Sequence, residues 1–293
     1  MERSLVLTGG TVREAVALAR AAELAGFAGV WIVQREIRDT WSRLAAIGSA
    51  TSRLRLGAWL SADRHPVLLV PRCLDVDDLS GGRVALALYG GRAGGPRIRE
   101  AVELLRALLS APWGSPFRFR GRFYEVQFDH YPFRFRQPGQ RSIPLWLVGA
   151  EPTLARLAGE VAEGLVVPPL ESHPYLADVI RPALLEGAVR SGRSRLAKLA
   201  GCLAVAGVGD EASTQSNVNG TTLQHGPNRL ASIRSQRQLE QYVIARLESL
   251  GGRDLRPDGS VRHSTAEEQA GRLRELADVL DEVVLCPPTF GLR

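Results

Sequence analysis

The chain has almost no lysine. Of its 37 basic residues only Lys198 is a lysine, so arginine supplies nearly all of the positive charge behind the formal net charge of +6. Acidic residues are interleaved with the arginines, whereas a nucleic-acid-binding protein concentrates its basic residues in a stripe. The segment nearest to such a stripe is 117–136, FRFRGRFYEVQFDHYPFRFR. We therefore expect no nucleic-acid partner, and an anionic small molecule fits the scattered arginines better.

Long apolar runs are also absent. No run approaches the roughly 18 residues that a membrane span needs, and the short SLVLT run after Arg3 is too brief for a secretory signal. The sequence thus predicts a cytoplasmic protein without a membrane partner.

Cysteine is scarce. Cys73, Cys202 and Cys286 are odd in number, far apart and in no CxxC pair. This pattern argues against a disulfide scaffold and a zinc site, and it suits a reducing compartment. We expect the three side chains to pack as small buried hydrophobic groups, and we expect no metal site.

Short apolar runs and helical stripes alternate along the chain. The run at 5–7 is followed by Thr11 and Glu14, which have the spacing of a capping box, and then by an apolar stripe of helical period. Gly26 ends this predicted helix. The next run, 29–33, is apolar without alternation, as expected of a strand buried on both faces.

The full pattern predicts eight strands, each of the first seven followed by a helix. The strands are 5–7, 29–33, 54–60, 83–89, 145–148, 165–167, 199–208 and 282–286. Such alternation implies a parallel sheet with right-handed crossovers, and eight units in 293 residues match a TIM barrel. A doubly wound sheet is the alternative, but the first strand ends in TGGT and not in GxGxxG.

We therefore predict an α/β protein, a single (β/α)8 TIM-barrel domain over 1–293, with two insertions. The first, at about 113–143, is interpreted as a hairpin and loop. The second, at about 209–262, contains a polar loop at 210–237 and a turn at 251–259. Functional side chains of such a barrel lie at the carboxyl ends of its strands, where His65 and His173 are the histidines found.

Several segments resemble the bacterial-luciferase-like superfamily. They read FAGVWIVQ, RHPVLLVPRCLDVDDLSGGRVALALYGG, GRFYEV, IPLWLVGAEPTLARLAGEVAEGLVVPP and TAEEQAGRLRELADVLDEVVLCP. The resemblance covers about 5–190 and 264–288, and its most specific part is the RHP…LD…LSGGR block at 64–83. It implies a TIM-barrel flavin monooxygenase or reductase that uses FMN or the deazaflavin coenzyme F420.

The resemblance also implies two cofactor contacts. A bulge with a non-prolyl cis peptide in the third strand would support the flavin ring from behind. Its residues are Ala58, Trp59 and Leu60. The cofactor phosphate would meet the start of the fifth helix, where backbone N–H groups and the positive helix end favour an anion. The residues there are Gly149, Ala150, Glu151, Pro152 and Thr153. The alternative is that Gly149 is a turn residue and Thr153 an ordinary helix cap.

The chain departs from the family pattern at the ends of strands two and four. Members usually carry an acid and then histidine after strand two, where this chain has Gln34 and Arg35. A GxGxG usually ends strand four, where this chain has ALYGG with Gly90, and Arg92 replaces an acid of some deazaflavin-dependent relatives. Amide and guanidinium groups are not general bases near pH 7. The two arginines either grip a carboxylate substrate or form surface ion pairs.

These departures favour reduction over oxygenation. Hydride delivery from a reduced deazaflavin to a C=N or C=C bond needs positioning and a proton donor, which water, Tyr89 or His65 provides. The resemblance thus implies an F420-dependent oxidoreductase of a small organic substrate, of the kind found in actinomycete natural-product biosynthesis. The alternatives are an FMN-dependent monooxygenase and a non-catalytic relative that binds a flavin or a partner.

The aromatic insertion has two interpretations. It is a half-buried hairpin with partial substrate contact, which we favour, or it packs a dimer contact. Its aromatic residues are Phe117, Phe119, Phe123, Tyr124, Phe128, Tyr131, Phe133 and Phe135. Superfamily members are often dimers, so we expect a homodimer.

Overall fold

Eight parallel strands close into a barrel in the computed structural model. The structure describes residues 1–7, 11–34, 39–90, 94–134, 142–168, 172–204, 253–255, 261–263, 271 and 273–286. The barrel strands are β1 (Glu2–Leu7), β2 (Gly29–Val33), β3 (Arg55–Ser61), β4 (Val84–Tyr89), β7 (Leu145–Val148), β8 (Gly164–Val167), β9 (Lys198–Ala204) and β12 (Glu282–Cys286). Each pairs with its neighbour in this order, and β12 pairs with β1 to close the ring. The predicted TIM barrel is confirmed.

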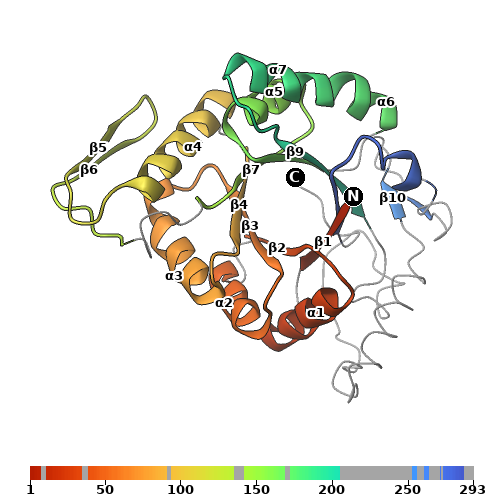
Figure 1. Ribbon diagram of the computed structural model, residues 1–293, viewed down its shortest axis with the longest axis horizontal. Coiled ribbons are helices and arrows are strands. Elements are labelled where there is room, and N and C mark those ends of the chain that lie inside the picture. Colours follow the sequence, from red (N-terminus) through yellow and green to blue (C-terminus); the bar gives the residue numbers. More distant parts are fainter. Residues whose placement is uncertain are drawn as a thin grey trace, which may run out of the picture.

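Helices lie outside this ring (Figure 1). The described helical segments are α1 (Val12–Leu24), α2 (Thr40–Ala50), the one-turn η1 (Pro66–Leu68), α3 (Val70–Ser80), α4 (Gly94–Ser110), α5 (Pro152–Val161), and the continuous run of α6 (His173–Tyr175), η2 (Leu176–Ile180) and α7 (Arg181–Arg190). The predicted capping box of α1 is confirmed, because Thr11 and Glu14 each accept a hydrogen bond from the other's backbone N–H. In the described part of the chain, no helix is both long enough and apolar enough to span a membrane.

An antiparallel hairpin separates α4 from β7. Its strands are β5 (Phe117–Arg120) and β6 (Glu125–Phe128), and in Figure 1 it projects outward beyond α4. The predicted hairpin is confirmed. In the second insertion, β10 (Arg253–Leu255) pairs with β11 (Val261–His263). The turn predicted at 251–259 is therefore wrong over β10, whereas the predicted loop at 210–237 lies outside the described residues.

Three tryptophans fill the barrel interior. The side chains of Trp31, Trp59 and Trp146 are fully or almost fully buried in a cluster formed by the inward-facing residues of the strands. Their rings pack at 6.1 and 5.8 Å between centroids, with Trp31 in the middle. Two glycines make room for them: a Cβ at Gly57 would lie 1.9 Å from the ring of Trp31, and one at Gly164 would lie 2.3 Å from the ring of Trp146. The interior is thus a packed core and not a channel.

A charged cluster closes the amino end of the barrel. The Arg55 guanidinium pairs with the fully buried carboxylate of Glu282 and lies 3.6 Å from Glu2, which also binds Lys198 at 2.7 Å. The same guanidinium lies 5.5 and 5.4 Å from the ring centroids of the two glycine-backed indoles. A buried carboxylate is stable only when it is paired with a cation. Because Arg55 makes this pair and also contacts two indole rings, it links the amino end of the barrel to its aromatic core.

Cys202 and Cys286 form a disulfide, which corrects the expectation drawn from the cysteine pattern. The two residues lie 84 positions apart in the sequence, but β9 and β12 are neighbours in the closed barrel and both side chains face the interior. The distance between the two cysteines in the sequence therefore did not predict their pairing. The cysteine pattern also gives no argument for a reducing compartment. Cys73 is a buried free thiol, as expected, and burial raises its pKa well above the ordinary value.

We predict that Gly57→Ala destabilises the protein by at least about 3 kcal/mol, because the new methyl group overlaps a fully buried indole. Gly271→Ala is the matched control, since nothing lies within 4 Å of a Cβ there. The control should be neutral or stabilise by up to about 1 kcal/mol. Urea unfolding measures both variants, and equal midpoints for the two would contradict the packed interior.

Reduction of the disulfide should lower the free energy of unfolding by about 4 kcal/mol, because the bond closes a loop of 84 residues in the unfolded chain. Urea unfolding with and without dithiothreitol measures this change. The double variant Cys202→Ala, Cys286→Ala serves as the control and should not respond to the reductant. An equal response of both proteins rules out the bond as its source.

Candidate functional site

The most specific block of the family resemblance ends in a structural arginine. Arg83 donates hydrogen bonds to four carbonyl oxygens, those of Gly48, Thr51, Leu54 and Ser80, at 2.7 to 2.9 Å. It precedes the first residue of β4, so it lies at the amino end of the barrel. In this position it joins the end of α2 to the end of α3, away from the face that carries function in TIM barrels.

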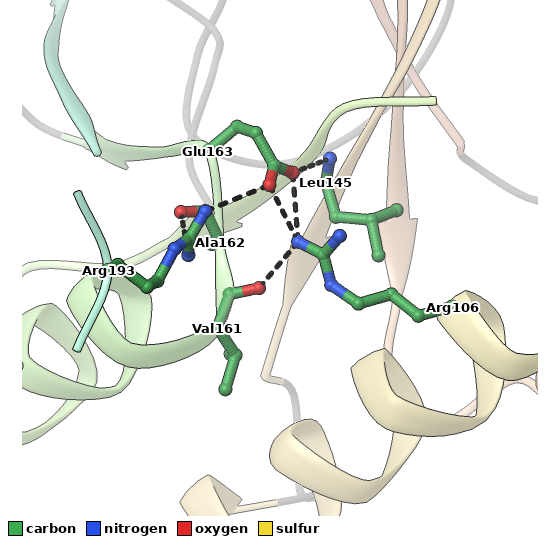
Figure 2. A network of polar contacts seen from close by, with 6 residues as sticks. All are labelled: Arg106, Leu145, Val161, Ala162, Glu163 and Arg193. Atoms are coloured by element: carbon green, nitrogen blue, oxygen red, sulfur yellow. Dashed lines mark hydrogen bonds and ion pairs between the residues drawn. The ribbon is translucent and has the colours of Figure 1, made fainter. Parts of the chain in front are cut away.

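A second arginine cluster lies at the same end (Figure 2). The Glu163 carboxylate accepts hydrogen bonds from Arg106 at 2.7 Å, from Arg193 at 3.0 Å and from the Leu145 N–H at 2.8 Å. Glu163 directly precedes β8, and Leu145 is the first residue of β7. Arg106 and Arg193 therefore stabilise the fold through Glu163, at the end of the barrel opposite to the functional face.

The carboxyl end of the barrel is the candidate site, and we call it the mouth. Several residues at the strand ends are half-buried, in contrast to the fully buried layer beneath them. They are Val33, Gln34, Ser61, Tyr89, Gly90, Gly149, Ala150 and Pro168. Small side chains predominate among them.

The predicted bulge in the third strand is wrong. β3 pairs with β4 without a break from Leu56 to Ser61, and with β2 without a break as far as Trp59. Ala58 and Leu60 pack in the outer core between the strands and the helices, whereas Trp59 packs inward with the other indoles. Regular alternation therefore leaves Trp59 as the one residue of the three that faces the barrel interior.

Gln34 lies at the end of β2, as predicted, and its backbone N–H donates to the Trp59 carbonyl at 2.8 Å. Its side-chain Oε1 is buried and has no hydrogen-bond partner among the described residues. A buried polar atom of this kind requires a partner from outside those residues, either a ligand or a nearby loop.

Tyr89 and Gly90 end β4 beside the end of β3. The Tyr89 carbonyl accepts a hydrogen bond from the Ala62 N–H at 2.9 Å, which fixes the first residue after β3. Gly90 is half-buried, and a Cβ there would lie 3.0 Å from Ile98. Both residues therefore lie at the mouth, where the sequence placed them.

His65 lies in the loop that leaves β3 and is half-buried. Its Nδ1 accepts a hydrogen bond from the Val67 N–H at 3.3 Å, so the neutral ring carries its proton on Nε2. Within the described residues Nε2 has no hydrogen-bond partner. His173, by contrast, faces Asp278 at 3.3 Å on the surface.

No side chain caps the start of α5, and the predicted phosphate contact there stays a prediction. Glu151 is the N-cap residue and makes no side-chain capping bond, while Thr153 lies inside the helix, so the alternative of a Thr153 cap is wrong. Gly149 is tightly packed, since a Cβ there would lie 2.4 Å from Leu154. The Ala150 carbonyl is held by the Tyr175 hydroxyl at 2.8 Å.

Arg35 and Arg92 lie outside the described residues, so their proposed grip on a carboxylate stays a prediction. Tyr124 is not among the site residues predicted from the sequence, where it is one of eight insertion aromatics and part of the GRFYEV segment. Its hydroxyl donates to the Ala62 carbonyl at 3.1 Å, and its ring meets the His65 ring edge-on at 5.3 Å. The position after GRF in the hairpin turn is the one signal for it in the sequence.

A family model described as luciferase-like monooxygenase matches residues 2–284. The chain belongs to this family. It is 31% identical over 202 residues to a putative coenzyme F420-dependent oxidoreductase of Mycobacterium tuberculosis, a match that covers 61% of this chain and 57% of the relative. The predicted resemblance and the predicted oxidoreductase class are confirmed at the level of the family.

Two solved structures share the luciferase-like fold of this chain. One is an F420-dependent secondary alcohol dehydrogenase in complex with an F420-acetone adduct, with TM-score 0.67, 16% identity and coverage of 98% of this chain and 93% of that one. The other is the monooxygenase RslO1 from Streptomyces bottropensis, with TM-score 0.62, 16% identity and coverage of 99% and 93%. At such identities the likeness establishes the fold alone.

The hairpin of this luciferase-like chain should loosen in acid. Burial opposes ionisation of Glu100, but backbone N–H donors from Phe123, Tyr124 and Arg122 outweigh it and hold the pKa of its carboxyl below the ordinary 4.5. A lowered pKa stabilises the fold above pH 4.5, and this stabilisation is lost as the pH falls through the folded-state value.

We therefore predict that Glu100→Gln is less stable than the parent at neutral pH and that the difference shrinks below pH 4.5. Urea unfolding across this pH range measures the difference. Glu103→Gln, an exposed change on the same helix, is the control and should match the parent throughout. A constant difference at every pH would show that the Glu100 carboxylate charge plays no part.

Proposed function

We propose that this protein binds coenzyme F420 at the barrel mouth and transfers a hydride between it and a C=N or C=C bond of a small organic substrate. The observation that carries the proposal is the mouth itself, a surface of small, half-buried residues above a solid indole core. The packed interior leaves no space for a planar ring, so we assign the ring to the mouth. The F420-dependent relative and the F420-dependent structural neighbour support this choice of cofactor.

The residues of the mouth fit such a group. The buried Gln34 Oε1, which has no partner among the described residues, is an acceptor for a ring N–H. At the other side of the mouth, no side chain caps the start of α5. We assign the cofactor phosphate to the backbone N–H groups of Ala150 and Thr153, because the Gly149 N–H already donates to the Val166 carbonyl at 2.9 Å. The exposed Glu151 carboxylate would repel a phosphate, so we assign no side-chain contact to it.

When bound, the reduced deazaflavin supplies the hydride, and the protein has to hold the substrate and supply a proton. The Nε2–H of His65 is the proton donor that we favour, since its tautomer is fixed by the Val67 N–H. The Tyr89 hydroxyl is the second candidate. We further propose that Arg35 and Arg92 bind a carboxylate group of the substrate, for which guanidinium groups are suited.

An FMN-dependent monooxygenase is the second candidate function. The family description and the RslO1 neighbour favour it. Gln34 and Arg35 argue against it, because they replace the acid and histidine that the family resemblance leads one to expect at the end of β2. A relative that binds a flavin or a partner without catalysis is the third possibility. The experiment below separates the first two and detects a relative that binds neither cofactor.

Purified protein should bind F420 more tightly than FMN, with a Kd below about 100 μM, which corresponds to about −5.5 kcal/mol. Fluorescence titration with each cofactor measures both constants. Tighter binding of FMN would support the monooxygenase instead. If the protein binds neither cofactor, the result would support a non-catalytic relative.

Gln34→Leu should weaken binding of F420 about fivefold, because it removes the buried acceptor at the mouth. Gln127→Leu makes the same change at an exposed position of β6 and should bind like the parent. Equal affinity of the two variants would remove Gln34 from the cofactor site.

A further inference from the structure

The turn of the inserted hairpin reaches back to the barrel mouth through Tyr124. The Tyr124 hydroxyl donates to the Ala62 carbonyl at 3.1 Å, and the Ala62 N–H donates to the Tyr89 carbonyl at 2.9 Å. Ala62 is the first residue after β3 and is buried. Its backbone is thus held from one side by β4 and from the other by the hairpin, although these parts are far apart in the sequence.

Helix α4 holds Tyr124 at both ends. Glu100 accepts a hydrogen bond from the Tyr124 backbone N–H at 2.7 Å, and Arg97 Nε donates to the Tyr124 hydroxyl at 3.3 Å. Arg97 also lies 5.6 Å from the centroid of the Tyr124 ring. The two α4 residues are three positions apart, so they share one face of the helix. A buried tyrosine fixed at its backbone and at its hydroxyl has little freedom to turn.

Glu100 fixes the rest of the hairpin turn as well. Its carboxylate accepts hydrogen bonds from the backbone N–H groups of Arg122 and Phe123 at 2.9 and 2.8 Å. Gly121 leaves space for this carboxylate, because a Cβ there would lie 2.0 Å from Glu100 Oε1. The GRFY turn is therefore built around a buried acid on α4, and this acid sets where Tyr124 lies.

Tyr124 in turn packs against His65. The two rings meet edge to face, at 90° and 5.3 Å between centroids. On its other side His65 Nδ1 accepts the Val67 N–H at 3.3 Å. The ring is thus held by one hydrogen bond and one aromatic contact, and Nε2–H is left for a group outside the described residues.

We infer that Tyr124 is a positioning residue, through which the inserted hairpin orients the His65 imidazole at the barrel mouth. The role of His65 as proton donor rests on the proposed function, whereas its orientation by Tyr124 does not. A proton donor must lie within hydrogen-bond reach of its acceptor, so a ring that can turn delivers its proton less often. The hairpin is in this view part of the active-site structure.

The tautomer of His65 tests the inference without any cofactor. Protein labelled with 15N-histidine is studied by NMR at about pH 8, where imidazole is neutral, and His65→Gln assigns the signals. The parent should show His65 protonated on Nε2. Tyr124→Leu removes the ring that packs against His65, so the imidazole is able to turn away from the Val67 N–H. The ratio of Nε2–H to Nδ1–H should then fall about fivefold. Tyr124→Phe keeps the ring and should show a smaller fall.

Tyr131→Phe is the matched control. It removes another tyrosine hydroxyl of the same insertion, which donates to the Leu108 carbonyl far along α4 from Arg97. The control should leave the His65 signals as in the parent. If Tyr124→Leu does not fold, Arg97→Gln replaces it, since this change at a half-buried position removes the donor to the Tyr124 hydroxyl and should shift the ratio in the same direction.

An unchanged His65 ratio in the folded Tyr124 variants would overturn the inference, and so would an equal change in Tyr131→Phe, which would indicate a general loosening of the hairpin. A parent protonated on Nδ1 would overturn it too. Failure of the proposed function is a separate result, because it appears as absent F420 binding while the His65 tautomer still responds to Tyr124.

Discussion

The packing of Trp31 on Gly57 and of Trp146 on Gly164 excludes ligands from the interior of the barrel. Any side chain in place of either glycine would overlap an indole, and the three interior indoles leave no channel through the barrel. The Arg55 guanidinium, stacked near two of the rings and paired with a buried carboxylate, closes the same core from below. We therefore propose the carboxyl end as the binding face, because the strand ends there are half-buried.

The charged residues follow the same division. At the amino end Arg83 binds the carbonyl groups at the ends of helices, and Glu163 joins Arg106 and Arg193, so these groups are saturated by the protein itself. At the carboxyl end Gln34 Oε1 has no partner within the described residues, and His65 is bonded at Nδ1 alone. Both side chains are half-buried at the ends of strands, as polar groups of a binding site are.

Much of the fold followed from local pattern. Apolar runs without alternation predicted β2 and β4, and the spacing of Thr11 and Glu14 predicted the start of α1, because strand burial and helix capping depend on neighbouring residues. Contacts between distant segments did not follow. The Cys202–Cys286 bond depends on barrel closure, and the bulge expected at Trp59 from the family resemblance is absent from this strand. At the site, His65 and Tyr89 could be placed from the ends of strands. The link from Glu100 through Tyr124 to His65 could not, because it joins three elements that only the folded chain brings together.

A crystal structure of the protein with F420 bound tests the central claim most directly. We expect the tricyclic ring at the carboxyl ends of β2, β3 and β4, close to Gln34, Ala62 and Gly90, and the cofactor phosphate at the start of α5, with the three interior indoles in the positions described above. A ring bound at the amino end, or one inserted among displaced indoles, would contradict it.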